Sequence, residues 1–385
     1  MNAIPYGRQE IDDADIAAVV AVLRSEWLTQ GPAVARFEAD MAKRCGAPHA
    51  VAVNSATSAL HLACRALGLG PGDIGWTTPN TFVASANCLL YCGAGVDFVD
   101  IDPDTRNLSV DALAAKLSLA DRSGRLPKVV IPVHFAGRSC DMAGIRRLAD
   151  RYGFRIIEDA SHAVGATCQG TPVGACEYSD LAVFSFHPVK IMTTGEGGMV
   201  LGNDAGLMRR VALLRSHGIT REAEEMDGAS EGGWYYQQTE LGYNYRMTDL
   251  QAALGSSQLQ RMAGFLARRR ELAARYGERL ADLPLDLPPP SEESAWHLYA
   301  VRLRQPERRR AVFDALRAAG IGVNVHYIPV HLQPWYRRLG FRPGDFPNAE
   351  AYYVGALSLP LWPGLSDAMQ DEVVAQLAGA LRARS

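Results

Sequence analysis

The sequence has no long hydrophobic run and no marked excess of charge. Its longest apolar stretches, such as residues 129–133 and 181–186, fall far short of the roughly 20 residues that a membrane-spanning helix needs. Hydrophobic residues make up 48% of the 385 residues and charged residues 21%, with a formal net charge of -3. This balance excludes a disordered or fibrous chain and leaves no positive surplus for wrapping nucleic acid or coating an anionic membrane. An enzyme acting on small molecules fits this composition.

Paired cysteines and a secretory leader are also missing. The seven cysteines are an odd number and contain no CxxC pair, which is typical of reduced thiols rather than of a disulfide framework or a zinc site. We therefore expect no bound metal. Residues 1–8 show no basic region followed by an apolar core. These absences predict a cytoplasmic protein with no membrane partner.

Lysine is scarce, since only four of the 39 basic residues are lysines, at positions 43, 116, 128 and 190. The first three lie in polar parts of predicted helices or at the start of a predicted strand, as solvated charges do. Lys190 differs because it follows the apolar run 181–186 and precedes the glycine-rich segment 195–198. A lysine amine can form a Schiff base with a carbonyl, whereas arginine cannot. Lys190 is therefore a candidate catalytic amine, the alternative being an ordinary turn residue.

Short apolar runs and amphipathic segments alternate over the first two-thirds of the chain. This alternation predicts an α/β architecture with a mainly parallel sheet covered by helices. The expected strands are residues 49–53, 74–78, 96–100, 129–134, 155–158, 181–186 and 198–201. The expected helices are residues 57–67, 82–92, 110–119, 141–152 and 206–215, with an N-terminal arm helix at 11–25.

The pattern changes after residue 249, where a long helix (250–283) leads to a proline-rich break (284–290). This change predicts a second domain that begins within the long helix. We expect a large cofactor-binding domain with the N-terminal arm at residues 1–255 and a smaller C-terminal α+β domain at 256–385. The smaller domain is expected to contain strands at 295–303 and 323–327 and helices at 307–319 and 366–382.

Several polar segments follow predicted strands. Residues 54–58 (Asn-Ser-Ala-Thr-Ser) lie at a strand-to-helix junction, where backbone amides and the helix dipole favour a phosphate, although an ordinary N-cap has the same pattern. Asp159 ends an otherwise apolar strand, at the edge of the sheet where ligands bind in open α/β folds. Ser185 lies at the end of a neighbouring strand and Lys190 follows that strand. Phe82, which on its own is more typical of a core residue, follows another.

An anion nest, a carboxylate at a strand end, an aromatic ring and a single lysine together predict a pyridoxal 5′-phosphate (PLP) site. Lys190 would be the Schiff-base amine and Asp159 the anion that keeps the pyridine nitrogen protonated. His162 is expected near the oxygen edge of the ring or packed beside it. The predicted cofactor-binding residues are Ala56, Thr57, Ser58, Phe82, Asp159, His162, Ser185 and Lys190.

The order and spacing of six motifs resemble the DegT/DnrJ/EryC1/StrS family of sugar aminotransferases. The motifs lie at residues 54–60, 158–162, 184–190, 193–198, 241–246 and 325–327, so the resemblance covers nearly the whole chain. It implies the PLP-dependent transferase fold type I (aspartate aminotransferase-like) and a homodimer with shared active sites. It also implies that Asn244 binds the phosphate of the partner subunit's cofactor.

The identity of residue 190 separates two reactions within that family. Some members carry histidine there and dehydrate the sugar, so Lys190 favours transamination. Ile191 and Met192 follow the lysine where many members have proline or asparagine. This departure leaves the amine in place and puts the shape of the loop in doubt.

Tyr6 and residues 27–32, 76–87 and 325–331 look most like the branch that aminates UDP-linked 4-keto-6-deoxy-N-acetylhexosamines. The resemblance then implies transfer of the amino group of L-glutamate to C4, giving UDP-4-amino-4,6-dideoxy-N-acetyl-β-L-altrosamine for pseudaminic acid biosynthesis. A different UDP- or dTDP-linked keto sugar and, less favoured, a PLP-dependent sugar dehydration are the alternatives. Substrate contacts are expected from Tyr6, Thr29, Gln30 and His326.

Overall fold

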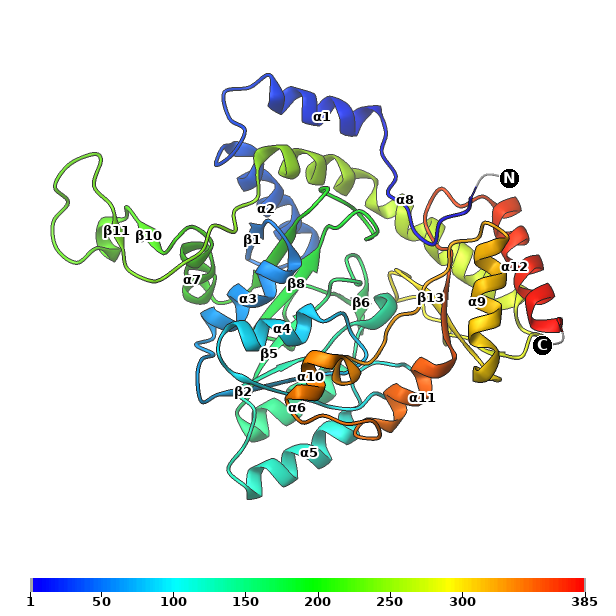
Figure 1. The fold of residues 1–385 in the computed structure, drawn as a ribbon. Helices are drawn as coiled ribbons and strands as arrows, with labels where there is room; N and C mark the ends of the chain where they lie inside the picture. Colours follow the sequence, from blue (N-terminus) through cyan, green and yellow to red (C-terminus); the bar gives the residue numbers. More distant parts are fainter. Residues whose placement is uncertain (1–2, 384–385) are drawn as a thin grey trace.

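The computed structural model describes residues 3–383, and a seven-stranded sheet forms its centre (Figure 1). Its strands are β1 (His49–Val53), β2 (Ile74–Thr77), β3 (Gly95–Phe98), β4 (Val129–Ile131), β5 (Arg155–Asp159), β8 (Leu181–Ser185) and β9 (Gly198–Gly202). Their order across the sheet is β1-β9-β8-β5-β4-β2-β3. Neighbouring strands are parallel except for β9, which is antiparallel to both β1 and β8. The mainly parallel sheet predicted from the sequence is confirmed.

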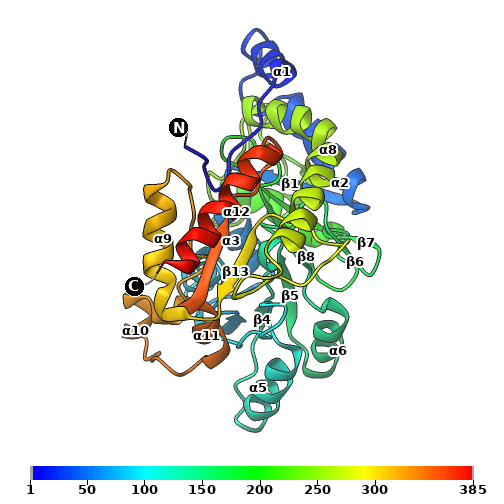
Figure 2. The same cartoon turned by 90° about the vertical axis from the view of Figure 1, so that its right-hand side faces the viewer.

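Helices cover both faces of this sheet (Figures 1 and 2). One core lies between the strands and α3 (Ala56–Ala66), α4 (Ala84–Tyr91) and α7 (Ala205–Arg215). The opposite face packs against α2 (Pro32–Cys45), α5 (Val110–Arg122), α6 (Met142–Tyr152) and α8 (Asp249–Arg279). Successive strand side chains alternate between the two cores, since Ile157 and Val183 face the first and Ile156 and Phe184 the second.

A second, three-stranded antiparallel sheet consists of β12 (Leu285–Asp286), β13 (Tyr299–Leu303) and β14 (Ala356–Leu359). Together with α9 (Arg309–Ala318) and α12 (Asp367–Arg382) it surrounds a separate core, to which the C-terminal part of α8 contributes. The long helix α8 therefore packs against both cores, and the predicted domain boundary after residue 255 falls inside it. The helices α10 (Pro334–Arg338) and α11 (Pro347–Gly355) pack against the edge of the large sheet near β3.

The N-terminal arm extends across both parts of the molecule. Helix α1 (Asp13–Leu23) packs along α8. Ahead of it, Ile4 pairs with Ile321 and is buried in the core of the smaller sheet. The arm thereby carries Tyr6 to the boundary between the two cores.

None of the helices among residues 3–383 has the length and apolarity needed to cross a membrane.

The strand predicted at residues 323–327 is wrong. This segment makes one isolated bridge, between Asn324 and Ser358, and then continues along the pocket wall. The ladder partner of β13 is β14, whose four residues are all buried. Because β14 is short and buried on both faces, it shows no alternation that could reveal it. The short pairs β6 (Thr167–Cys168) with β7 (Thr171–Pro172), and β10 (Ile219–Thr220) with β11 (Gln237–Gln238), form hairpins, and the second projects from the body (Figure 1).

Candidate active site

A pocket of about 880 Å³ opens beyond the carboxyl ends of β5 and β8 and reaches the segment 324–327 of the smaller part. Most of the predicted site residues line it: Tyr6, Ala56, Thr57, Ser58, Phe82, Asp159, Ser185, Lys190 and His326. Thr29, Gln30 and Asn244 are exposed and lie outside its lining, while His162 is buried behind the wall. The structure therefore brings together both predicted catalytic residues and most of the predicted cofactor-binding residues, and leaves His162, Asn244 and two of the predicted substrate contacts outside the pocket lining.

The N-terminus of α3 lies at one end of the pocket. Ser55 caps the helix by accepting a hydrogen bond from the Ser58 backbone N–H (3.1 Å), and the Ser58 hydroxyl donates to Asn54 Oδ1 (2.6 Å). These bonds hold the first turn in place with the backbone N–H groups of Ala56 and Thr57 at the helix start, where the dipole favours an anion. Ser185, at the end of β8, lines the same pocket.

Gly198 allows β9 to pass directly against this helix start. A Cβ atom at position 198 would lie 2.5 Å from the backbone nitrogen of Ala56 and 2.5 Å from the carbonyl carbon of Ser55. Contacts that short with backbone atoms force the start of α3, residues 55 and 56, to move. The glycine is therefore required for the close approach of β9 to the start of α3.

Replacing Gly198 with alanine is expected to weaken PLP binding at least about tenfold, because the added methyl group displaces the Ala56 amide. Equilibrium titration of apoenzyme with PLP measures this. Gly264→Ala is the matched control, since a Cβ at 264 meets nothing within 4 Å. Wild-type affinity in Gly198→Ala would show that the nest does not hold the phosphate.

Asp159 lies at the end of β5 and is almost fully buried. One carboxylate oxygen accepts a hydrogen bond from the Ser85 hydroxyl (2.6 Å), which is itself 2.7 Å from Thr81 Oγ1, and the other accepts from the Ser161 backbone N–H (3.1 Å). No cation among residues 3–383 forms an ion pair with it. A buried carboxylate without a counter-charge is costly, so Asp159 is suited to a cationic group of a ligand, such as a protonated pyridine nitrogen.

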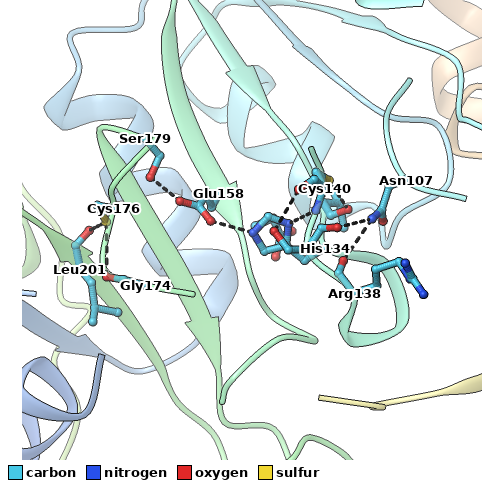
Figure 3. Close-up of polar contacts among 12 residues, drawn as sticks. Asn107, His134, Arg138, Cys140, Glu158, Gly174, Cys176, Ser179 and Leu201 are labelled. Carbon is cyan, nitrogen blue, oxygen red and sulfur yellow. Dashed lines mark hydrogen bonds and ion pairs between the residues drawn. The ribbon is translucent and has the colours of Figure 1, made fainter. Parts of the chain in front are cut away.

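The other side of the same strand is fixed by buried polar contacts (Figure 3). Glu158 points away from the pocket, with His134 Nε2 2.7 Å from one oxygen and the Ser179 hydroxyl 2.5 Å from the other. The backbone N–H of Cys140 donates to His134 Nδ1 (3.2 Å), so the ring carries its proton on Nε2 and donates it to Glu158. This network holds β5 beside β4 and β8 and thereby sets the position of Asp159.

Lys190 follows β8 at the pocket wall. Its amine forms no hydrogen bond or ion pair with any other residue of 3–383. Burial lowers the lysine pKa from 10.5 to about 8, although the negative charge of Asp159 acts in the opposite direction. An amine with this pKa is partly neutral near physiological pH and can act both as nucleophile and as base.

The lowered pKa predicts how fast apoenzyme captures PLP at different pH values. Only the neutral amine attacks an aldehyde, so the capture rate is expected to rise about tenfold per pH unit up to about 8 and then level off. Stopped-flow absorbance of PLP uptake between pH 6 and 10 measures this, these limits being about two units on either side of the lysine pKa. A rate that continues to rise above pH 9, roughly a unit beyond that pKa, would contradict the lowered value.

Aromatic and imidazole side chains from the smaller part complete the wall. Tyr327 and His297 line the pocket and were not predicted from the sequence, although Tyr327 directly follows the predicted His326. His326 Nδ1 is 2.8 Å from the Ser358 hydroxyl, and burial together with the Lys190 charge lowers its pKa to about 4. Phe82 is 60% exposed within this otherwise buried site, as expected for a ring that awaits a planar partner.

These residues fit PLP. An amine with no other partner, a buried carboxylate with no counter-charge and a glycine-dependent cradle at a helix N-terminus match the aldehyde, the pyridine nitrogen and the phosphate of that cofactor. The fold and this arrangement define a PLP-dependent enzyme of fold type I.

The chain belongs to the DegT/DnrJ/EryC1/StrS aminotransferase family, whose sequence profile matches residues 9–378. It is 40% identical over 379 residues to the spore coat polysaccharide biosynthesis protein SpsC of Bacillus subtilis, covering 96% of this chain and 95% of SpsC. The protein is therefore a PLP-dependent aminotransferase of the sugar type, and the family predicted from the sequence motifs is confirmed.

Solved structures agree in both fold and cofactor. Helicobacter pylori PseC, an aminotransferase involved in the biosynthesis of pseudaminic acid, superposes with a TM-score of 0.91 at 30% identity over 99% of each chain. The sugar aminotransferase Spr1654 from Streptococcus pneumoniae superposes with a TM-score of 0.88 at 32% identity over 98% of each chain, in its PLP form and its PMP form alike.

Proposed function

We propose that the protein transfers the amino group of L-glutamate to C4 of a UDP-linked 4-keto-6-deoxy-N-acetylhexosamine, forming UDP-4-amino-4,6-dideoxy-N-acetyl-β-L-altrosamine for pseudaminic acid biosynthesis. The observation that carries the proposal is the near-complete structural match to H. pylori PseC. The presence of Lys190 in the pocket supports amination over dehydration, because the amine is needed for nitrogen transfer.

The reaction would follow a ping-pong course. Bound PLP supplies a carbonyl that exchanges amino groups and a ring that accepts electrons. Lys190 Nζ removes the proton from the α-carbon of L-glutamate in the first half and returns a proton to C4 of the sugar in the second. Asp159 would hold a proton on the ring nitrogen of bound PLP. The Ala56 and Thr57 amides with Ser185 would hold its phosphate, and Phe82 would contact its ring.

A second candidate substrate is another nucleotide-linked keto sugar, UDP- or dTDP-linked. The specific observation in its favour is the 40% identity with SpsC, a spore coat polysaccharide biosynthesis protein, against 30% with PseC. Both candidates use the same amine, carboxylate and phosphate cradle. They differ in the groups that contact the sugar and the nucleotide, for which we propose Tyr6 and His326 within the pocket, with Thr29 and Gln30 outside its lining.

Visible absorbance of glutamate-treated holoenzyme tests the proposal. Glutamate should bleach the PLP band, and each nucleotide sugar is then added in turn. Rapid return of the band only with the UDP-linked N-acetyl sugar supports the proposed substrate. Return with a dTDP-linked 4-keto-6-deoxy sugar favours the second candidate, and a band that glutamate cannot bleach contradicts transamination.

We further propose that the enzyme works as a homodimer in which Asn244 binds the cofactor phosphate of the partner subunit. Asn244 is exposed and lies outside the pocket of its own chain. Helix α1 and the segment after it also expose large apolar side chains, among them Ile16, Leu23, Trp27 and Leu28, and such surfaces mark interaction sites. The solution mass measured by light scattering tests the dimer.

The cytoplasmic location stays a prediction.

A further inference from the structure

His162 is buried behind the pocket wall and is held by two polar contacts. The backbone N–H of Ala136 donates to His162 Nδ1 at 3.3 Å, and His162 Nε2 lies 3.1 Å from the Tyr327 hydroxyl oxygen. Burial, together with the nearby Lys190 and His326, lowers the His162 pKa well below 6.5, so the ring is neutral. Since Nδ1 accepts a hydrogen bond, the single ring proton is on Nε2 and points at Tyr327.

This tautomer fixes the direction of the Tyr327 hydroxyl. His162 donates to its oxygen, so the tyrosine proton must point elsewhere. Among residues 3–383 no acceptor receives it, while Tyr327 itself lines the pocket. Burial raises the pKa of Tyr327, so the proton stays on the phenol at working pH. The hydroxyl proton of Tyr327 is therefore available to the pocket, where an oxygen of a bound ligand can accept it.

The backbone around His162 and His297 holds the His162 ring in its contact with Tyr327. Ala136 has a φ of 58°, a left-handed conformation that is unfavourable for an L-residue with a side chain. It donates its N–H to His162 and accepts the N–H of His297 at 2.9 Å. The His297 ring lies 4.4 Å from that of His162, and the buried Arg269 donates to the His297 carbonyl (3.2 Å). A strained residue maintained by contacts on both sides is typical of a functional site.

We infer that His162 acts through Tyr327, by fixing the Tyr327 hydroxyl as a hydrogen-bond donor to an acceptor oxygen of the ligand in the pocket. His162 is then a positioning residue, and Tyr327 makes the contact. The acceptor is an oxygen either of the cofactor ring or of the sugar. Both sources share the chemistry of an oxygen that accepts one hydrogen bond, and the two readouts below separate them.

The test compares Tyr327→Phe, His162→Leu and their double variant as holoenzymes. The first readout is the pH midpoint of the visible PLP band. The second readout is kcat/KM for the nucleotide-linked keto sugar that the wild-type enzyme aminates. If the wild-type enzyme does not aminate the UDP-linked sugar, the proposed substrate is contradicted, and this test is carried out with the sugar that is aminated. If the acceptor belongs to the cofactor ring, the midpoint rises by about one unit, because an oxygen without its donor holds negative charge less well. If it belongs to the sugar, kcat/KM falls about tenfold at an unchanged midpoint.

A relay requires that both single variants change the same readout by similar factors and that the double variant is no worse than either. His162→Gln, which keeps a donor toward Tyr327, is expected to restore most of the effect, whereas a purely structural role would not be rescued in this way. Tyr276→Phe is the matched control, since that buried hydroxyl donates to the Pro360 carbonyl in the smaller core. Additive losses in the double variant, or a Tyr327→Phe enzyme unchanged in both readouts, would overturn the inference.

Discussion

Replacing Lys190 with alanine is expected to abolish transamination, with kcat falling by about 10⁴-fold or more, while PLP still binds. No other lysine can substitute, because Lys43 on α2, Lys116 (paired with Asp97) and Lys128 (paired with Asp73) all lie outside the pocket lining. The cradle at the start of α3 and the carboxylate of Asp159 are untouched by the change, so cofactor retention after dialysis should persist. Two quantities are measured for the variant and the wild type: kcat with L-glutamate and a keto sugar, and the amount of PLP that remains bound after dialysis.

Lys128→Ala provides the control for this experiment. Its amine is partly exposed and bonds Asp73 and the Gly68 carbonyl at the amino end of the sheet, the edge opposite the pocket. Lys128→Ala also removes one lysine amine, and this variant should retain wild-type kcat. Nitrogen-labelled L-glutamate makes the outcome specific, because only a transaminase places the label in the sugar product. Labelled product from Lys190→Ala at a rate near that of the wild type would remove the lysine from the mechanism.

The candidate active site could be located from the sequence because many of its residues lie at or just after the ends of short predicted strands. In an open α/β sheet, side chains just beyond the carboxyl ends of neighbouring strands meet at one edge. Asp159 and Ser185 end β5 and β8, and the nest follows β1, so placing the strands also placed these groups. Because the chain has only four lysines, the one that follows an apolar strand, Lys190, is the candidate amine. The fold could be predicted for the same reason, since central strands such as β4 and β8 are short apolar runs that alternate with amphipathic helices.

The wall formed by the smaller part could not be predicted in the same way. Tyr327 and His297 reach the pocket from segments without regular structure, held by contacts such as those of Ala136 and Arg269 that are distant in sequence. The place of His162, expected near the oxygen edge of the ring or packed beside it, also depends on tertiary detail, because its contact Tyr327 is 165 positions away in the sequence. Periodicity reports local burial, and it carries no information on such long-range hydrogen bonds.

Asp159→Asn is expected to lower kcat by about 10²- to 10³-fold with a smaller change in KM. An amide cannot hold a proton on the ring nitrogen, and an unprotonated ring accepts electrons poorly. Ser85→Ala removes one hydrogen bond to the same carboxylate (2.6 Å) and should give a smaller loss in the same direction. Asp150→Asn, which alters an exposed carboxylate on α6, is the control and should leave kcat unchanged.

Stability separates this role of Asp159 from a structural one. In the apoenzyme the buried carboxylate has two hydrogen bonds and forms no ion pair within residues 3–383. Removing the charge should therefore raise the melting temperature of the apoprotein while lowering both activity and the stabilisation gained on adding PLP. Calorimetry of apo and PLP-bound forms measures both effects. If Asp159→Asn instead destabilised the apoprotein and left kcat within a few-fold of wild type, the carboxylate would serve the fold, and the ring nitrogen would need another partner.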